Sequence, residues 1–277
     1  MRREIVISFF AAALAAGCET VDTTKSGEVG VERHQRMLVS SEEINQASDK
    51  AYHDLLQQAQ AKGALNRDPA QLERVKRIQD RIIPQTGAFR ADAPKWKWEV
   101  NVISTKDVNA FSMPGGKTAV FSGLIEQLKP SDDELAAVMG HEIGHALREH
   151  ARERASEAAA QQVGLGVVGA VLGVPSGYLD LSSVLLNVMF TLPHSRTQET
   201  EADRIGVELA ARAGYDPHAA ISLWEKMQKL GGGKQSPQFL STHPSNEARI
   251  ADLRNYAERV MPLYQQAKAR GSAAAGR

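Results

Sequence analysis

Apolar residues recur at intervals of three and four over two stretches near the N-terminal end, and each stretch predicts an amphipathic helix. The first covers residues 41–62 and the second covers residues 68–83. Asp68-Pro69 is a good start for the second helix, because aspartate caps the first backbone N–H groups and proline suits the first turn. The early part of the domain is therefore expected to be helical.

Two later segments alternate apolar and polar residues, which is typical of half-buried strands. They are residues 98–103 and 117–121. Between them, Met113-Pro114-Gly115-Gly116 is a turn signal. We therefore expect residues 108–111 to form either an exposed edge strand or one arm of a plain core hairpin.

A further helix is expected after Ser131, because Ser131 and Glu134 have the spacing of a capping box. Beyond this start, adjacent helical rows hold a partly apolar set of residues, which we expect to face inward. The set is Leu135, Val138, Met139, Glu142, His145 and Ala146. The charged residues within 148–154 are then expected to turn the helix toward solvent.

The same helix carries the pentapeptide His141-Glu142-Ile143-Gly144-His145. Histidines four residues apart lie one above the other on a helical face, so both rings can reach one metal ion. Glu142 projects beside such a metal, where it can take a proton from metal-bound water. The alternative is an ordinary amphipathic helix that happens to contain two histidines.

A catalytic zinc needs a third protein ligand, and an acidic segment downstream offers one. Glu199 and Asp203 are four residues apart and share a helical face. The first can bind zinc, and the second can accept the free ring N–H of a ligand histidine. Glu201 points away from that face, so we expect it to be solvated or paired with an arginine. Without the histidine pair, such a cluster would be a solvated helix face.

Two more histidines are candidates for a role near the site. In the elongated metzincin pattern the third histidine comes six residues after the second, and that position is Ala151 here. We therefore interpret His150 as a helix-surface residue or as a partner of a ligand, not as a ligand. His243 lies in Thr242-His243-Pro244 at an expected loop-to-helix junction, where it is either functional or a plain surface residue.

Together these segments resemble the CAAX-prenyl-protease-like zinc metallopeptidases, the group that includes HtpX-type and periplasmic BepA-like proteins. The resemblance runs from about residue 90 to residue 255. It is carried by the histidine pair, by Ser195-Arg196-x-x-Glu199-x-x-Ala202-Asp203, by His243-Pro244 with Arg249, and by residues 109–116. It implies an α+β, mainly helical zincin-type fold with a small β-sheet beside the active-site helix.

The resemblance also implies roles for single residues. His141, His145 and Glu199 would be the ligands of one zinc ion, and Glu142 would be the general base. His243 would approach the metal, where it stabilises the oxyanion or occupies the open position in a latent form. Arg249 would frame the site and pair with Asp203. Asn109, Ala110 and Phe111 would lie in a strand to which substrate peptide adds by backbone hydrogen bonds.

The first eighteen residues predict a targeting signal. Met1-Arg2-Arg3 is positively charged, and an apolar run from Ile5 to Ala16 is too short to span a bilayer. Ala15-Ala16-Gly17-Cys18 resembles a bacterial lipobox, although Leu14 stands one position earlier than that motif usually has it. Cys18 is the only cysteine, which suits a lipid attachment point; the alternative is a plain secretory signal. By resemblance to bacterial sorting rules, Glu19 indicates the outer membrane.

The chain is expected to divide into four parts. These are a lipoprotein signal peptide (1–17), a flexible tether (18–40), a metallopeptidase domain (41–265) and a disordered tail (266–277). Apolar runs at 163–174 and 181–192 form either two buried helices that pack on the site or a mobile flap. A formal net charge of zero argues against nucleic acid as a partner.

These patterns predict a zinc endopeptidase of the bacterial periplasm, tethered to the inner leaflet of the outer membrane through Cys18. Its partners would be polypeptide substrates, with misfolded or stalled envelope proteins implied by the resemblance alone, and possible outer-membrane assembly machinery. The alternative is a lipoprotein assembly factor or holdase with latent or secondary peptidase activity. A purely structural zinc is less consistent, because such sites normally use cysteine and the domain has none.

Overall fold

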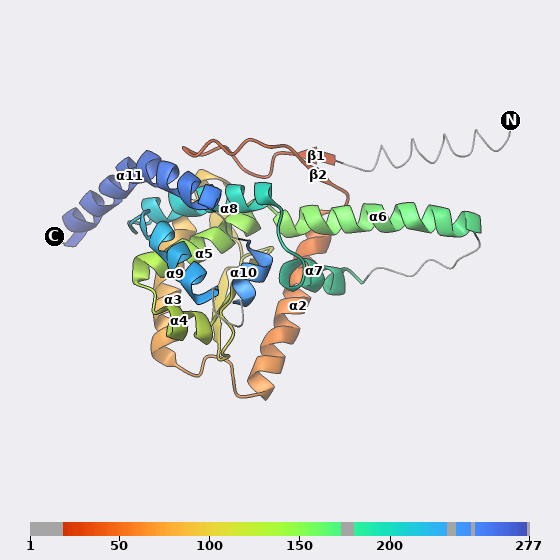
Figure 1. Ribbon diagram of the computed structural model, residues 1–277, viewed down its shortest axis with the longest axis horizontal. Coiled ribbons are helices and arrows are strands. Elements are labelled where there is room, and N and C mark those ends of the chain that lie inside the picture. Colours follow the sequence, from red (N-terminus) through yellow and green to blue (C-terminus); the bar gives the residue numbers. More distant parts are fainter. Residues whose placement is uncertain (1–18, 173–179, 232–236, 245–246, 276–277) are drawn as a thin grey trace.

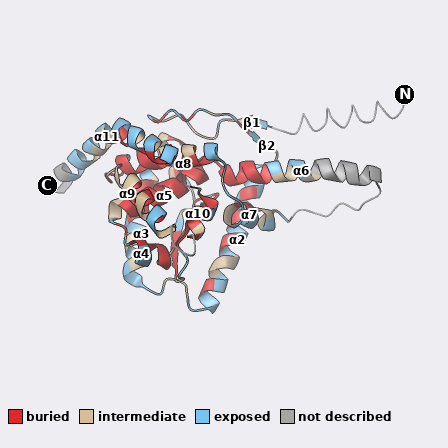
Figure 2. Cartoon of the chain, viewed as in Figure 1, coloured by how far each residue is buried: buried red, intermediate tan, exposed pale blue. Residues whose placement is uncertain are grey.

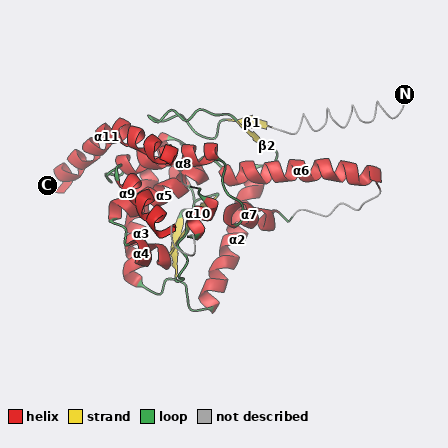
Figure 3. Ribbon diagram, in the orientation of Figure 1, coloured by secondary structure: helices red, strands yellow, loops and turns green. Residues whose placement is uncertain are grey.

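The computed structural model describes residues 19–172, 180–231, 237–244 and 247–275, without the side chains of 163–172 and 272–275. Most of this part of the chain is helical and only short segments are strands (Figure 3), so the mainly helical α+β prediction is confirmed. The helices are α2 (Ser41–Ala61), α3 (Pro69–Ile82), α4 (Ser122–Leu128), α5 (Asp132–Leu147), α6 (His150–Leu172), α7 (Leu181–Phe190), α8 (Arg196–Arg212), α9 (Ala219–Gly231), α10 (Gln238–Thr242) and α11 (Glu247–Ala275), with 3-10 turns η1 (Ile83–Ala88) and η2 (Ala93–Lys95). The strands are β1 (Glu19–Val21), β2 (Gln35–Met37), β3 (Glu99–Ile103), β4 (Ala110–Met113) and β5 (Lys117–Phe121).

The two early helices begin where their capping residues predict. The Asp68 side chain accepts hydrogen bonds from the backbone N–H groups of Ala70 and Gln71 at the start of α3. Ser40 and Glu43 form a reciprocal capping box at the start of α2. Both helix predictions are confirmed, since each boundary lies within one residue of its expected place.

The three-stranded sheet has the order β3-β5-β4, with β3 and β5 parallel and β4 antiparallel to β5. Gly115 and Gly116 turn the chain between β4 and β5 at φ angles of 78° and 88°, which favour glycine. The strand beginning near residue 108 is thus both at a sheet edge and in a hairpin. Its expected exposure is wrong, because α5 packs against β4 and buries all four of its residues.

Helix α5 lies at the centre of the molecule and is buried on every side from Glu134 to Leu147 (Figure 2), not along one stripe. Helices α8, α3 and α9 and strand β4 pack around it. Its crossing with α8 depends on glycine, because a Cβ on Gly140 would lie 2.8 Å from the carbonyl oxygen of Gly206. A Cβ on Gly206 would lie 2.6 Å from the backbone nitrogen of His141. This close approach brings the acidic segment of α8 up to the histidine pair.

The charged segment after α5 differs from its prediction. The helix ends at Leu147, Glu149 adopts a positive φ of 51°, and a new helix, α6, starts at His150. Instead of facing solvent, the charged residues within 148–154 are buried, and the first part of α6 is correspondingly red in Figure 2. Burial is possible because other segments supply partners, such as Glu201 for Arg148 and the Leu192 carbonyl for Arg154.

Residues 19–39, here called the N-terminal segment, pack along the domain, whereas the sequence suggested a flexible tether over 18–40. Val29 and Val31 belong to the main core, with 0% and 3% of their surface exposed. Arg33 forms ion pairs with Glu153 and Glu201. Apolar burial and buried charge pairs together hold this segment in place. At the other end, α11 continues to Ala275, through most of the tail that was expected to be disordered.

The predicted signal peptide, residues 1–17, and the lipidation site Cys18 lie outside the described residues. Within the part that is described, no helix is both long and apolar enough to cross a membrane.

Helices α6 and α7 contain the two apolar runs. In Figure 1, α6 leaves the main body, and α7 lies between α6 and α2. The side chains of the first run, 163–174, lie outside the described residues. In the second run, Leu185 and Val188 are buried while Leu186 and Leu192 are exposed, so α7 is a partly buried helix. Whether these runs also act as a flap stays a prediction.

Candidate metal centre

Four buried side chains from three separate segments converge beside α5. His141 and His145 come from α5, Glu199 from α8, and His243 from the residue that follows α10. One donor atom of each lies within 4.8 Å of all the others, which makes the group suitable for one metal ion. The structure therefore brings together the three ligands expected from the sequence and adds His243 as a fourth donor.

The spacing of these donors fits zinc. The Nε2 atom of His141 lies 3.1 Å from Nε2 of His145 and 3.2 Å from Nδ1 of His243. Glu199 Oε1 lies 3.3 Å from His145 Nε2 and 2.9 Å from His243 Nδ1. Tetrahedral ligands at zinc distances of about 2.0–2.1 Å are roughly 3.3 Å apart. Nitrogens that face one another at this range, in a buried site with a carboxylate, are the donor set expected around a shared cation.

Glu142 lies next to this donor group and is only 3% exposed. Its Oε1 atom is 3.6 Å from Nε2 of His243 and 4.0 Å from Nε2 of His141, and it accepts no hydrogen bond from any described residue. Burial raises the pKa of this carboxyl group above its ordinary value, although the charges of His243 and His141 oppose the shift. A carboxylate whose pKa is moved toward neutrality suits a group that must both take and return a proton.

The outer nitrogen of His141 faces a buried ion pair. His141 Nδ1 lies 2.9 Å from Asp203 Oδ1, and Arg249 binds both oxygens of Asp203 at 2.8 Å. Burial alone would raise the pKa of Asp203, but the charges of Arg249 and His141 lower it. Asp203 is thereby kept ionised 2.9 Å from Nδ1, where its charge favours a proton on Nδ1 and leaves Nε2 free to bind a metal. Asp203 therefore lies beside His141, and Arg249 pairs with Asp203, as the sequence analysis expected.

The outer nitrogen of His145 meets a second histidine. Its Nδ1 atom lies 2.8 Å from Nδ1 of His150, and Nε2 of His150 lies 2.9 Å from Glu201 Oε2. Of the two interpretations of His150, the surface position is wrong, because its side chain is fully buried. Glu201 is likewise not solvated, and it pairs with Arg33 and Arg148, as its alternative interpretation held.

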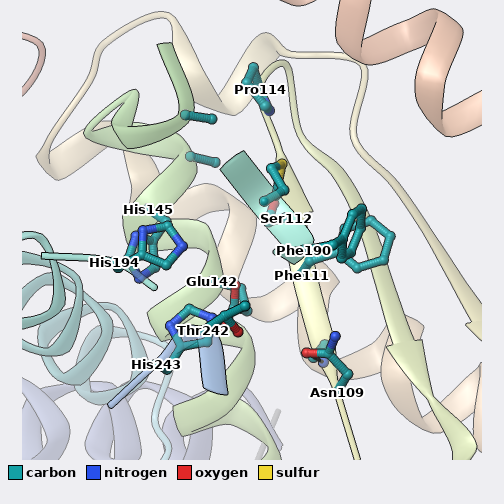
Figure 4. A pocket seen from close by; sticks show the side chains of 14 residues that line it. Asn109, Phe111, Ser112, Pro114, Glu142, His145, Phe190, His194, Thr242 and His243 are labelled. Carbon is teal, nitrogen blue, oxygen red and sulfur yellow. Dashed lines mark hydrogen bonds and ion pairs between the residues drawn. The ribbon is translucent and has the colours of Figure 1, made fainter. Parts of the chain in front are cut away.

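The residues expected to bind substrate line a narrow pocket beside the metal centre. Asn109, Ala110 and Phe111 form one wall, opposite Glu142 and His243 (Figure 4). Phe190 of α7 packs edge-on against Phe111 with ring centroids 4.9 Å apart. The start of β4, the active-site helix and α7 thus enclose the same space.

His194 is a site residue that the sequence analysis missed. Its ring lies 4.2 Å from that of His145 and stacks on that of His243 at 4.9 Å, and it also lines the pocket. Arg154 lies 3.2 Å from its Nδ1, and the His194 backbone N–H donates to the carbonyl of Thr242. The one available signal was its position directly before Ser195, which caps α8.

Comparison with known proteins shows that residues 69–257 match the sequence profile described as peptidase family M48. The mitochondrial metalloendopeptidase OMA1 of Saccharomyces cerevisiae is 35% identical over 61% of this chain and 50% of its own length. The metalloprotease LoiP of Escherichia coli is 29% identical over 91% of this chain and 96% of its own length. The beta-barrel assembly-enhancing protease of Escherichia coli is 28% identical over 64% of this chain and 38% of its own length.

The extent of these matches differs between relatives. The chain spans about half or less of the length of the OMA1 proteins, whereas it spans nearly all of LoiP. The residues that match the family profile, 69–257, contain the histidine pair, the α8 segment and His243.

Proposed function

The chain belongs to peptidase family M48, and from this premise we propose that it is a zinc metalloendopeptidase of the bacterial cell envelope. One observation carries the proposal: a buried His-His-Glu-His donor group with the carboxylate of Glu142 directly beside it. A structural zinc would not require a carboxylate that is buried without a hydrogen bond from the described residues.

The geometry assigns separate tasks to the residues around the donor group. A zinc ion held there would supply a charge that polarises a peptide carbonyl and lowers the pKa of a water molecule. Glu142, beside the donor group, would take a proton from water and deliver it to the leaving amine. Asn109, directly before β4, and Ala110 and Phe111 of β4 line the pocket and are buried in this closed form. We propose that an extended peptide aligns along this wall when the site opens.

His243 gives the site a closed form. Its Nδ1 atom completes a set of four protein donors, whereas a catalytic zinc keeps one position open for water. We propose that this arrangement is latent, and that His243 must move away before water or substrate can reach the metal. We propose that the displaced ring then stabilises the charge that develops on the substrate carbonyl.

The location and the substrates are also proposals. The LoiP match covers nearly the whole chain, and residues 1–18 have the pattern of a bacterial lipoprotein signal that ends in Cys18. We propose anchoring to the periplasmic face of the outer membrane, and misfolded or stalled envelope proteins as substrates. The similarity to a beta-barrel assembly-enhancing protease supports this choice and the BepA-like subtype, and it makes outer-membrane assembly machinery a candidate partner.

The activity is tested by comparing the wild type with Glu142→Gln, after both are shown to contain equal amounts of zinc. The substrate is an unfolded protein such as casein. We expect cleavage by the wild type and a loss of at least about 100-fold in the variant, because general-base catalysis contributes roughly 10²–10⁴-fold. Equal cleavage by both proteins would contradict the assigned role of Glu142.

A second function is favoured by the closed donor set. A protein whose metal is covered by His243 could act chiefly as an assembly factor or holdase, with latent or secondary peptidase activity. In cells that lack the wild-type protein, rescue of envelope integrity by Glu142→Gln would support this alternative. Failure of the variant to rescue would support proteolysis as the main function.

A further inference from the structure

The feature that the proposed function leaves unexplained is the buried row His145, His150, Glu201. A histidine that binds a metal commonly turns its other ring nitrogen to a carboxylate or a carbonyl, and Nδ1 of His141 lies 2.9 Å from the carboxylate of Asp203. His145 has no such partner among the described residues, since its Nδ1 faces Nδ1 of His150 at 2.8 Å. The carboxylate follows one residue later, where Glu201 Oε2 lies 2.9 Å from Nε2 of His150.

The proton positions in this row follow from its two ends. An ionised Glu201 has no proton to donate and can only accept hydrogen bonds, so Nε2 of His150 carries the proton between them. A neutral His150 then has a lone pair on Nδ1 and can accept from His145. His145 consequently carries its proton on Nδ1 and presents a lone pair on Nε2, which is the nitrogen that belongs to the donor group. Each ring therefore fixes the tautomer of the next.

The same contacts exclude His150 as a ligand. Its two ring nitrogens are occupied by His145 and Glu201, and its side chain has no exposed surface. The full burial of a polar ring is accounted for by these two hydrogen bonds.

Glu201 is in turn held by two arginines. Arg33 of the N-terminal segment binds its two oxygens at 2.9 and 3.0 Å, and Arg148 binds them at 3.2 and 3.3 Å. Arg148 also donates to the carbonyl of Arg33 at 2.8 Å, which ties the two arginines together. The row thus runs from the donor group to a segment more than one hundred residues away in the sequence.

We propose that His150 is a positioning residue that orients the metal ligand His145 and fixes its tautomer, and that Glu201, held by Arg33 of the N-terminal segment, keeps His150 in place. The proposal rests on the metal site of the proposed function, but it concerns metal affinity and not proteolysis.

The test is the zinc affinity of full-length His150→Ala, measured by competition with a chromophoric chelator. Loss of an outer partner of a ligand typically lowers metal affinity by about 10–100-fold, and we expect a loss in this range. His218→Ala is the matched control, because His218 also bonds to carboxylates, Asp216 and Glu258, but lies away from the donor group. The control should bind zinc as the wild type does.

Two further variants separate positioning from a merely structural role. His150→Gln keeps a group that can accept from His145 and donate to Glu201, so it should recover much of the lost affinity. Its cobalt-substituted form should have the visible absorption of the wild type, whereas that of His150→Ala should be shifted. If His150→Ala does not fold, Glu201→Gln, which preserves shape and removes only the charge, takes its place and should lose affinity as well.

Three outcomes would overturn the proposal. The first is wild-type zinc affinity in a folded His150→Ala, and the second, if that variant does not fold, is wild-type affinity in Glu201→Gln. The third is an equal loss in His150→Gln and His150→Ala with unchanged cobalt spectra. A wild-type protein that binds no zinc would contradict the metal site itself. A protein that binds zinc but does not cut casein would contradict only the proposed function.

Discussion

The two histidines of α5 present their metal-facing nitrogens in the same way, but the regions behind them are built differently. Behind His141, the partner is a carboxylate, Asp203, which is locked by Arg249 from α11. Behind His145, the partner is His150, and the carboxylate of Glu201 comes only after it. The support behind His141 is short and lies within residues 69–257, which match the family profile, whereas the support behind His145 extends to Arg33 of the N-terminal segment.

This difference shows how one helical motif can carry two kinds of support. The i, i+4 spacing decides where the two metal-facing nitrogens lie, but it decides nothing about the opposite ring nitrogens. Those depend on which side chains the rest of the fold brings to each ring. The His141 side depends on the close crossing of α5 and α8, whereas the His145 side also needs the turn at Glu149 that starts α6.

The largest expected effect comes from Glu199, whose carboxylate lies beside both His141 and His145. Glu199→Gln removes the only charged donor of the group, so zinc affinity should fall by more than the roughly 10–100-fold typical of an outer partner. Zinc content after equilibration at nanomolar free metal is the measurement. Unchanged stoichiometry under these conditions would remove Glu199 from the ligands.

The next effect sharpens the comparison directly. Asp203→Asn weakens the support of His141 and should lower zinc affinity by about 10–100-fold. It also leaves Arg249 without its main bidentate partner, so we expect the melting temperature of the zinc-free protein to fall too. An Asp203→Asn protein that binds zinc like the wild type would show that only the His145 side requires outer support.

The effect of His243→Ala concerns the closed form. The variant opens one position at the metal, and we expect the casein cleavage rate to rise several-fold if covering the metal is the main role of His243. A rate that is abolished instead would identify a role of this ring in the transition state. An unaltered rate in a variant that still contains zinc would contradict both roles.

The smallest expected effect concerns Arg33, which lies at the end of the row that starts at His145 and which also pairs with Glu153. Burial would raise the pKa of Glu153, but hydrogen bonds from Arg33, Gln35 and Gln198 lower it below its ordinary value. The stabilisation is therefore present above about pH 4.5 and is lost as the pH falls through the lower pKa of the folded state. Arg33→Met should lower the melting temperature by roughly 2–4 °C at pH 7, equivalent to about 1 kcal/mol, and by progressively less as the pH falls below about 4.5.

The control for this prediction is Arg36→Met, a substitution of an exposed arginine on the same segment. It should leave the melting temperature unchanged over the same pH range. A loss for Arg33→Met that stays the same down to the lowest pH at which the protein is folded would show that the charge of Glu153 does not contribute.

Much of the His141 side could be predicted from the sequence because its signals are local. The capping box of Ser131 sets the start of α5, and the four-residue spacings set the faces on which His141, Glu199 and Asp203 lie. Strands β3 and β5 were likewise predicted from alternation alone. In each case the signal that made the prediction lies within a short stretch of the sequence.

The His145 side could not be predicted, because its interactions join distant segments. A run of charged residues after α5 looks solvated unless one knows that Glu201 and the N-terminal segment supply the partners. The positive φ of Glu149 gave no local signal, since it is not glycine. For the same reason His194 was missed, because its contact with His145 exists only after α7 and α8 have packed.

The most direct test of the account is a crystal structure of the protein purified with zinc, with anomalous data collected on both sides of the zinc absorption edge. The account predicts one anomalous peak, within about 2.1 Å of Nε2 of His141, Nε2 of His145 and a carboxylate oxygen of Glu199. In the latent form it should also contact Nδ1 of His243. A peak elsewhere, or none in a protein shown to contain zinc, would contradict the central claim that these residues form the metal site.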